Sequence, residues 1–368
     1  MNLKPNHRLP LMAMGMFSLL MALFGGVQRL GWELPTLTVA LPANHGSLMV
    51  GAFLGTVIGL ERAVALGRLW GFFGPLSTGL GGLLLIAGVA PPLAQLLIVT
   101  GSLMLCALFV AFLRRQFAWF TVIMLVGALS WLVGNLLWLL GNSIFVVVWW
   151  WMGFLLLTIA GERMELGRML FISKQRQRQM SVAVILSMLG IAVTLLDLDA
   201  GVRLLGVGMV AIALWLGLND VARSTVRQQG LTRFIAVNLL AGYVWLACCG
   251  LLLLLFGADF SGLRYDAVLH SFFLGFIFSM IFGHAPVIFP AVLGRGMIYR
   301  PAFYIHVVLL HVFLTVRVVG DLTVELLSRN ISGLINALTL LVFVLNTVLA
   351  IRAYHIRERS EAAPGESA

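Results

Sequence analysis

Long apolar runs recur along almost the whole chain, and they constrain its fold more than any other feature. Runs of 18 or more residues follow one another from Leu11 to Ala353. Each run is long enough to cross about 30 Å of hydrocarbon as a helix that rises about 1.5 Å per residue. Within lipid, backbone groups must be satisfied inside each segment, and the alternating pattern of barrel strands is absent. We therefore expect an all-α polytopic membrane protein.

The high hydrophobic content and the low content of charged residues also indicate a protein embedded in a lipid bilayer. Hydrophobic residues make up 61% of the chain and charged residues 10%, whereas about 25% of the residues of a soluble domain are charged. The net charge is +10, but the basic residues are scattered over short loops. Because no single basic face is formed, we expect no nucleic-acid partner.

Charge clusters and Gly or Pro breaks divide the chain into about twelve spans. The predicted spans are 11–30, 44–66, 71–89, 92–113, 117–140, 144–160, 180–197, 201–218, 232–256, 266–292, 301–319 and 331–353. With the N-terminus inside, nineteen of the 24 Lys and Arg residues fall on the inner side and five on the outer side. The positive-inside rule then places both termini in the cytoplasm. We expect one transmembrane domain, 1–355, followed by a polar, disordered cytoplasmic tail, 356–368.

Three predicted spans, the second, sixth and tenth, end in the same Leu-Gly-Arg sequence, at residues 66–68, 166–168 and 293–295. The recurrence has two interpretations. Glycine after the last turn and a basic residue near the negative end of the helix dipole form a common helix ending. Recurrence every four spans also fits three four-helix units, 1–115, 116–230 and 231–355, arranged as arcs about a pseudo-threefold axis.

Histidines are the most informative residues, because membrane interiors seldom keep ionisable side chains without a use for them. His45 begins the second span and His270 lies one turn into the tenth. The predicted topology places both near the outer face at similar depth. Two imidazoles facing each other from neighbouring helices commonly hold b-type haem in a helical bundle. We therefore predict that His45 and His270 bind a cofactor.

Three further histidines fall in the inner half of the predicted bundle. His284 lies fourteen residues after His270, about 21 Å along the helix. The eleventh span brings His306 to about the same depth and His311 nearer to mid-membrane. His284, His306 and His311 are candidates for a second metal or haem site, or for a proton relay. A hydrogen bond to a neighbouring helix is the structural alternative.

Two of these helices resemble motifs of the NnrS family. Residues 45–53, His-Gly-Ser-Leu-Met-Val-Gly-Ala-Phe, resemble its first histidine motif, and residues 267–283 are similar to its second, which runs through a Met-Ile-x-Gly step. NnrS proteins are bacterial inner-membrane proteins that contain haem and copper and are associated with nitric oxide metabolism and nitrosative stress. The resemblance implies haem b at His45 and His270, copper as a further metal, nitric oxide as a small gas ligand and a bacterial inner membrane.

A more distant similarity is to the catalytic subunit of haem-copper oxidases and nitric oxide reductases. That subunit has twelve spans in a pseudo-threefold arrangement and holds a haem between histidines of its second and tenth helices. It takes copper ligands from its sixth to eighth helices, whereas this chain has no histidine between His45 and His270. The similarity therefore implies the haem site without a conventional binuclear centre.

Two other classes of protein remain open. Twelve spans with a basic loop between the sixth and seventh are also the layout of secondary transporters, whose halves should repeat with an offset of six spans rather than four. A non-catalytic assembly factor, with a respiratory complex as its partner, is the other class. The chain has no Gly-rich phosphate loop, nucleophile elbow or zinc motif. We accordingly predict no particular enzymatic reaction.

Overall fold

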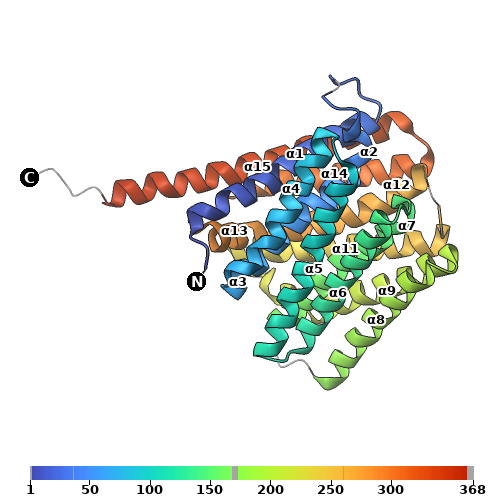
Figure 1. The fold of residues 1–368 in the computed structure, drawn as a ribbon, viewed down its shortest axis with the longest axis horizontal. Coiled ribbons are helices and arrows are strands. Elements are labelled where there is room, and N and C mark those ends of the chain that lie inside the picture. The colour runs from blue at the N-terminus through green and yellow to red at the C-terminus, as the bar shows by residue number, and fades with distance from the viewer. Residues whose placement is uncertain (1, 36, 168–172, 260, 363–368) are drawn as a thin grey trace, which may run out of the picture.

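The protein is a bundle of α-helices. The computed structural model describes residues 2–35, 37–167, 173–259 and 261–362, and within these ranges there are helices and no strand. The start of the first helix, α1 (Pro5–Arg29), and the end of the last, α15 (Leu326–Ala362), lie at one end of the bundle, which we call the terminal end (left in Figure 1). The short helices α2 (Ala40–Ser47) and α12 (Leu263–His270) lie at the other, which we call the histidine end (upper right in Figure 1).

The helices in chain order are α1 (Pro5–Arg29), α2 (Ala40–Ser47), η1 (Leu48–Leu54), α3 (Gly55–Leu66), η2 (Leu69–Phe72), α4 (Phe73–Ala87), α5 (Pro91–Arg115), α6 (Trp119–Leu139), α7 (Ile144–Gly167), α8 (Lys174–Val193), α9 (Leu198–Asn219), α10 (Ala222–Thr225), α11 (Gly230–Phe256), α12 (Leu263–His270), η4 (Ser271–Phe278), α13 (Ser279–Leu293), α14 (Phe303–Thr323) and α15 (Leu326–Ala362). Helices adjacent in sequence pack on one another, and α1 contacts α15, so that the first and last helices are neighbours.

Eleven helical segments of the described chain are long and apolar enough to cross a membrane, and they coincide with eleven of the twelve predicted spans. The remaining span, 180–197, falls on α8, whose first turns carry Lys174, Arg176 and Arg178. These charges leave a shorter apolar stretch. Helix α8 nevertheless packs along α9, and two termini at the same end require an even number of crossings. Both observations favour α8 as the twelfth span of a polytopic helical membrane protein.

Two of the Leu-Gly-Arg sequences are helix endings. Gly67 and Gly294 follow α3 and α13 with φ of +70° and +62°. Their N–H groups donate to the carbonyl oxygens of Ala63 and Pro290 at 3.1 and 2.9 Å, which is the hydrogen bonding of a left-handed cap. The helix-ending interpretation is confirmed at both positions, and Arg168 of the third copy lies outside the described residues. The three four-helix units stay a prediction.

The last helix is longer than expected. Helix α15 has 37 residues and continues through Ala362, so the prediction of a disordered tail is wrong for residues 356–362. Arg, Glu and Ala are good helix formers. His355 Nδ1 also lies 3.4 Å from Glu358 Oε2, one turn along the helix, which supports the helical form. Residues 363–368 of the predicted tail lie outside the described residues.

The two helices that carry the predicted haem ligands change to π-helix beside those ligands. The π segment η1 begins three residues after His45, and η4 begins immediately after His270. A π segment has i→i+5 hydrogen bonds, which rotate the helix surface locally, and such segments are frequent at functional sites. The second and tenth predicted spans are thus distorted at equivalent places.

Candidate functional site

A cavity of about 620 Å³ lies among the helices at the histidine end. Small-molecule and cofactor sites have volumes of roughly 300–1,000 Å³ and mostly apolar walls. Both His45 and His270 line this cavity, so the structure brings the two predicted ligands to one site. Its apolar walls include Leu23 and Val27 of α1, Val50 and Leu54 of η1, Val148 and Trp151 of α7, Ile277 and Phe278 of η4, and Leu340 of α15.

The rings of His45 and His270 are held in the same way. His45 Nδ1 lies 2.7 Å from the carbonyl oxygen of Ala22, and His270 Nδ1 lies 2.9 Å from that of Asp266. A carbonyl oxygen only accepts, so each Nδ1 carries a proton, and in the neutral ring Nε2 then keeps its lone pair. Metal-binding histidines are usually oriented by such a hydrogen bond from the second ring nitrogen. Both side chains are therefore in the tautomer that can bind a metal through Nε2.

Gly26 of α1 makes room for the ring of His45. A Cβ atom at position 26 would lie 2.8 Å from His45 Cε1 and 2.9 Å from His45 Nδ1. Such distances are shorter than van der Waals contact, so any side chain there would push the imidazole away from α1. The orientation of His45 thus depends on a glycine in the neighbouring helix.

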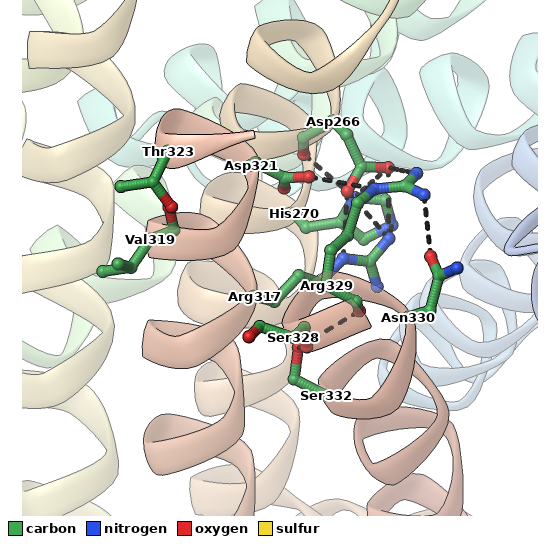
Figure 2. A network of polar contacts seen from close by, with 10 residues as sticks. All are labelled: Asp266, His270, Arg317, Val319, Asp321, Thr323, Ser328, Arg329, Asn330 and Ser332. Carbon is green, nitrogen blue, oxygen red and sulfur yellow. Dashed lines mark hydrogen bonds and ion pairs between the residues drawn. The ribbon is translucent and has the colours of Figure 1, made fainter. Parts of the chain in front are cut away.

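A network of charged side chains surrounds His270 (Figure 2). Arg317 donates two hydrogen bonds to the Asp266 carboxylate, from Nε to Oδ2 at 2.9 Å and from Nη2 to Oδ1 at 3.1 Å. Arg329 Nη2 lies 3.5 Å from Asp266 Oδ1. Arg317 Nη2 also lies 3.3 Å from His270 Nε2. Asp266 therefore links the predicted ligand to two arginines.

Asp321 extends this network into the bundle. Its side chain is fully buried, and Oδ1 lies 2.9 Å from Arg329 Nε as an ion pair. Arg29 of α1 lines the same cavity as Arg317 and Arg329. The guanidinium groups of Arg317 and Arg329 thus contact the carboxylates of Asp266 and Asp321, whereas Arg29 donates to the carbonyl oxygen of Pro42. Three arginines and one aspartate therefore line the cavity, and this positive lining favours an anionic ligand.

Sequence reasoning counted Arg317 and Arg329 only as topology signals and did not single out the two acids. A signal was present, because Asp266 precedes His270 by four residues and Asp321 follows Arg317 by four. Residues four apart share one face of a helix. An ionisable pair on one face of a membrane helix is a functional-site hypothesis by default.

His306 and His311 lie in separate surroundings. His306 Nδ1 accepts from the side-chain amide of Asn346 at 3.2 Å, and His311 Nδ1 accepts from Trp245 Nε1 at 3.0 Å. Because Nδ1 accepts in both rings, the proton is on Nε2. These two histidines therefore have the opposite tautomer to His45 and His270.

His284, the third histidine predicted for a second site, contacts an arginine instead of a histidine. Its Nε2 lies 3.4 Å from Arg163 Nη1, and its Nδ1 donates to the carbonyl oxygen of Met280 at 2.7 Å. Within the described chain, no group of three or more His, Cys, Asp or Glu side chains is placed to hold a metal ion. The structure therefore does not bring His284, His306 and His311 together.

His284 belongs to a second polar network, toward the terminal end. Arg163 of α7 donates to both carboxylate oxygens of Asp220, at 2.7 and 2.8 Å. Tyr243 of α11 donates to Asp220 Oδ2 at 3.1 Å. The Arg163 and Asp220 side chains are only 3% and 2% exposed, so this ion pair is completely desolvated.

A second ion pair joins the ends of α3 and α7. Arg62 of α3 donates to the Glu162 carboxylate of α7 and also lies 3.5 Å from Glu61. The Glu-Arg sequences at the ends of the second and sixth spans therefore contact each other directly. They are more accessible than the Arg163 pair, with Arg62 12% and Glu162 26% exposed.

These features define the class of protein: a polytopic α-helical membrane protein with a cavity among its helices, walled by apolar side chains and bordered at the histidine end by two histidines and three arginines. A family model described as "Domain of unknown function (DUF8744)" matches residues 8–352. The chain therefore belongs to this family. None of the curated proteins matches it.

Proposed function

We propose that this protein binds one haem b in the cavity at the histidine end, where the imidazoles of His45 and His270 would hold it. One observation carries the proposal: two histidines from two π-distorted helices line the same cavity, and both hold Nδ1 against a backbone carbonyl oxygen, which leaves the Nε2 lone pair of a neutral ring for a metal. Axial ligation by imidazole requires this tautomer. The NnrS-like motifs around the same two histidines support the assignment.

The walls of the cavity fit a large, mostly apolar macrocycle. Its volume of about 620 Å³ is within the range of cofactor sites, and aliphatic and aromatic side chains from α1, η1, η4 and α15 form most of its surface. Iron at His270 Nε2 would replace only the 3.3 Å contact with Arg317, which keeps its two hydrogen bonds to Asp266. The ligand position is therefore accessible without breaking the charged network.

The arginines fit the carboxylates of such a ligand. Arg29, Arg317 and Arg329 line one cavity, and guanidinium groups bind carboxylates strongly and with defined geometry. The two propionates of haem would share these three cations with Asp266. The haem edge that bears the propionates would then face the histidine end of the bundle.

The chemistry that a haem with two histidine ligands supplies is one-electron transfer. What the chain itself does is to orient both imidazoles through Ala22 and Asp266, to place cations near the carboxylates and to exclude water with apolar walls. We place the protein in nitric oxide or respiratory metabolism because the NnrS resemblance supports that setting. The resemblance also implies copper, but the described residues include no group of three or more His, Cys, Asp or Glu side chains that would fit it. We propose no particular reaction for the bound haem.

We also propose a bacterial inner membrane with both termini in the cytoplasm. The excess of Lys and Arg on one side of the predicted spans supports this orientation, and so does the common location of the two termini (Figure 1). A fluorescent protein fused to the C-terminus should fluoresce, whereas alkaline phosphatase fused there should be inactive. The reverse pattern would contradict the orientation.

Optical spectroscopy tests the haem directly. Protein expressed with ample iron and haem precursor should purify with a Soret band and about one haem per chain. His45→Ala and His270→Ala should each remove the haem or convert its low-spin spectrum to a high-spin one. His311→Ala is the matched control, since that ring is bound to Trp245 and has the other tautomer, and it should leave the spectrum unchanged.

Two results would contradict the proposal. The first is a colourless, metal-free protein under these conditions, which would favour a transporter or an assembly factor. The second is a haem spectrum that both alanine variants of the predicted ligands leave unchanged. Copurification with a respiratory complex in the absence of a bound cofactor would specifically favour the assembly factor.

A further inference from the structure

Asn336 of α15 is a buried polar residue without a partner. Its side chain is 1% exposed, and neither the amide nitrogen nor the amide oxygen has a hydrogen-bond partner. The residue lines the cavity at the histidine end, as do Gly333, Ala337 and Leu340 on the same helix. Buried polar groups in proteins are nearly always hydrogen-bonded, so an amide in this position points to a partner within the cavity.

The position of Asn336 along α15 shows which part of a ligand it would meet. Arg329 and Asn336 both line the cavity and are seven residues apart, which is about two turns or about 10.5 Å along the helix. Because seven residues almost complete two turns, the two side chains lie on one face of α15. A ligand whose carboxylates meet Arg329 would therefore bring its opposite, deeper edge toward Asn336.

We propose that Asn336 hydrogen-bonds a polar substituent on this deeper edge and so selects a haem that carries a carbonyl group there over one that carries only hydrocarbon. The inference rests on the proposed haem site and adds a specificity-determining residue to it. A hydrocarbon edge leaves the buried amide unpaired, and sites with buried polar groups reject ligands that cannot pair with them. The apolar neighbours Ala337 and Leu340 offer no alternative partner for that substituent.

Another asparagine of α15 provides a matched control. Asn346 donates from its side-chain nitrogen to His306 Nδ1 at 3.2 Å and to the carbonyl oxygen of Ala302 at 3.4 Å. It therefore has partners inside the protein and does not line the cavity. Replacing it removes the same chemical group from the same helix without touching the ligand.

The test compares two haems in the full-length protein. Protein produced without haem is titrated with protohaem, which carries vinyl groups, or with spirographis haem, in which a formyl group replaces one vinyl. The wild type should bind spirographis haem about fivefold more tightly, the ratio that one neutral hydrogen bond supplies. In Asn336→Leu the ratio should fall to about one, and in Asn346→Leu it should stay at the wild-type value.

A second measurement needs no variant. Resonance Raman scattering reports the formyl C=O stretch, which should lie at a lower frequency in the wild-type complex than for spirographis haem in detergent micelles. Equal affinities in the wild type, a preference that survives Asn336→Leu, or an unshifted formyl frequency would overturn the inference while leaving the haem site in place. Failure to bind either haem would overturn the haem site and this inference together.

Discussion

The buried ion pair between Arg163 and Asp220 allows a stability prediction that does not depend on the proposed function. Asp220 accepts four hydrogen bonds: two from Arg163 at 2.7 and 2.8 Å, one from Tyr243 at 3.1 Å and one from the Ala222 N–H at 2.7 Å. Both members of the pair are almost completely buried. The pair ties α7 to the segment between α9 and α11.

Removing one partner should be much more harmful than removing both. Arg163→Met leaves the Asp220 carboxylate buried without a cation, and breaking a buried pair in this way costs about 3–5 kcal/mol. In the double variant Arg163→Met, Asp220→Leu no uncompensated charge remains. The hydrogen bonds of Tyr243 and Ala222 to Asp220 are then lost, at about 1 kcal/mol each, together with the 3.4 Å contact between Arg163 and His284. We expect the double variant to be more stable than Arg163→Met alone.

The assay is reversible unfolding in mixed detergent micelles, with increasing SDS and intrinsic tryptophan fluorescence as the probe. An exposed pair on α9 provides the control: Arg203 and Asp199 are also joined at 2.8 Å, but their side chains are 42% and 55% exposed. Arg203→Met should lower the free energy of unfolding much less than Arg163→Met does, because water screens the exposed pair. The reasoning is refuted if Arg163→Met costs no more than Arg203→Met, or if the double variant is less stable than Arg163→Met.

Two further predictions concern the position of the His45 ring and the ion pair between α3 and α7. Gly26→Ala should displace the imidazole of His45 and weaken or alter the haem spectrum, because the added Cβ would lie 2.8 Å from the ring. Gly217→Ala on α9 is the control, since a Cβ there meets nothing within 4 Å and the residue does not line the cavity. Equal spectra in both variants would contradict the prediction. Arg62→Glu should lower the free energy of unfolding by about 1 kcal/mol. Adding Glu162→Arg should restore part of that loss in the same unfolding assay. If the effects of the two substitutions simply add, the pair is not formed.

The positions of the spans could be read from the sequence, because a membrane span needs only a sufficiently long apolar run and the backbone satisfies itself within the helix. Eleven predicted spans coincide with candidate membrane helices. Depth along a helix also follows from counting residues, so His45 and His270 could be placed at one level and are found lining one cavity.

The sequence did not show which face of each helix points into the bundle. His284, His306 and His311 were grouped by depth alone, yet their rings contact Arg163, Asn346 and Trp245 on different helices. The lipid-facing side and the buried side of a membrane helix look similar in sequence, because both consist mostly of apolar residues. Which face turns inward is therefore decided by packing.

The sequence by itself determined a helical membrane protein, its span positions and the depth of its histidines, since these depend on local apolar length and residue counting. The tertiary structure decided which groups meet. It joined Asp266 of α12 to Arg317 of α14 and left Asn336 unpaired beside the same cavity. Asp266 and Arg317 are 51 positions apart in the chain, and no local pattern reports which helices become neighbours.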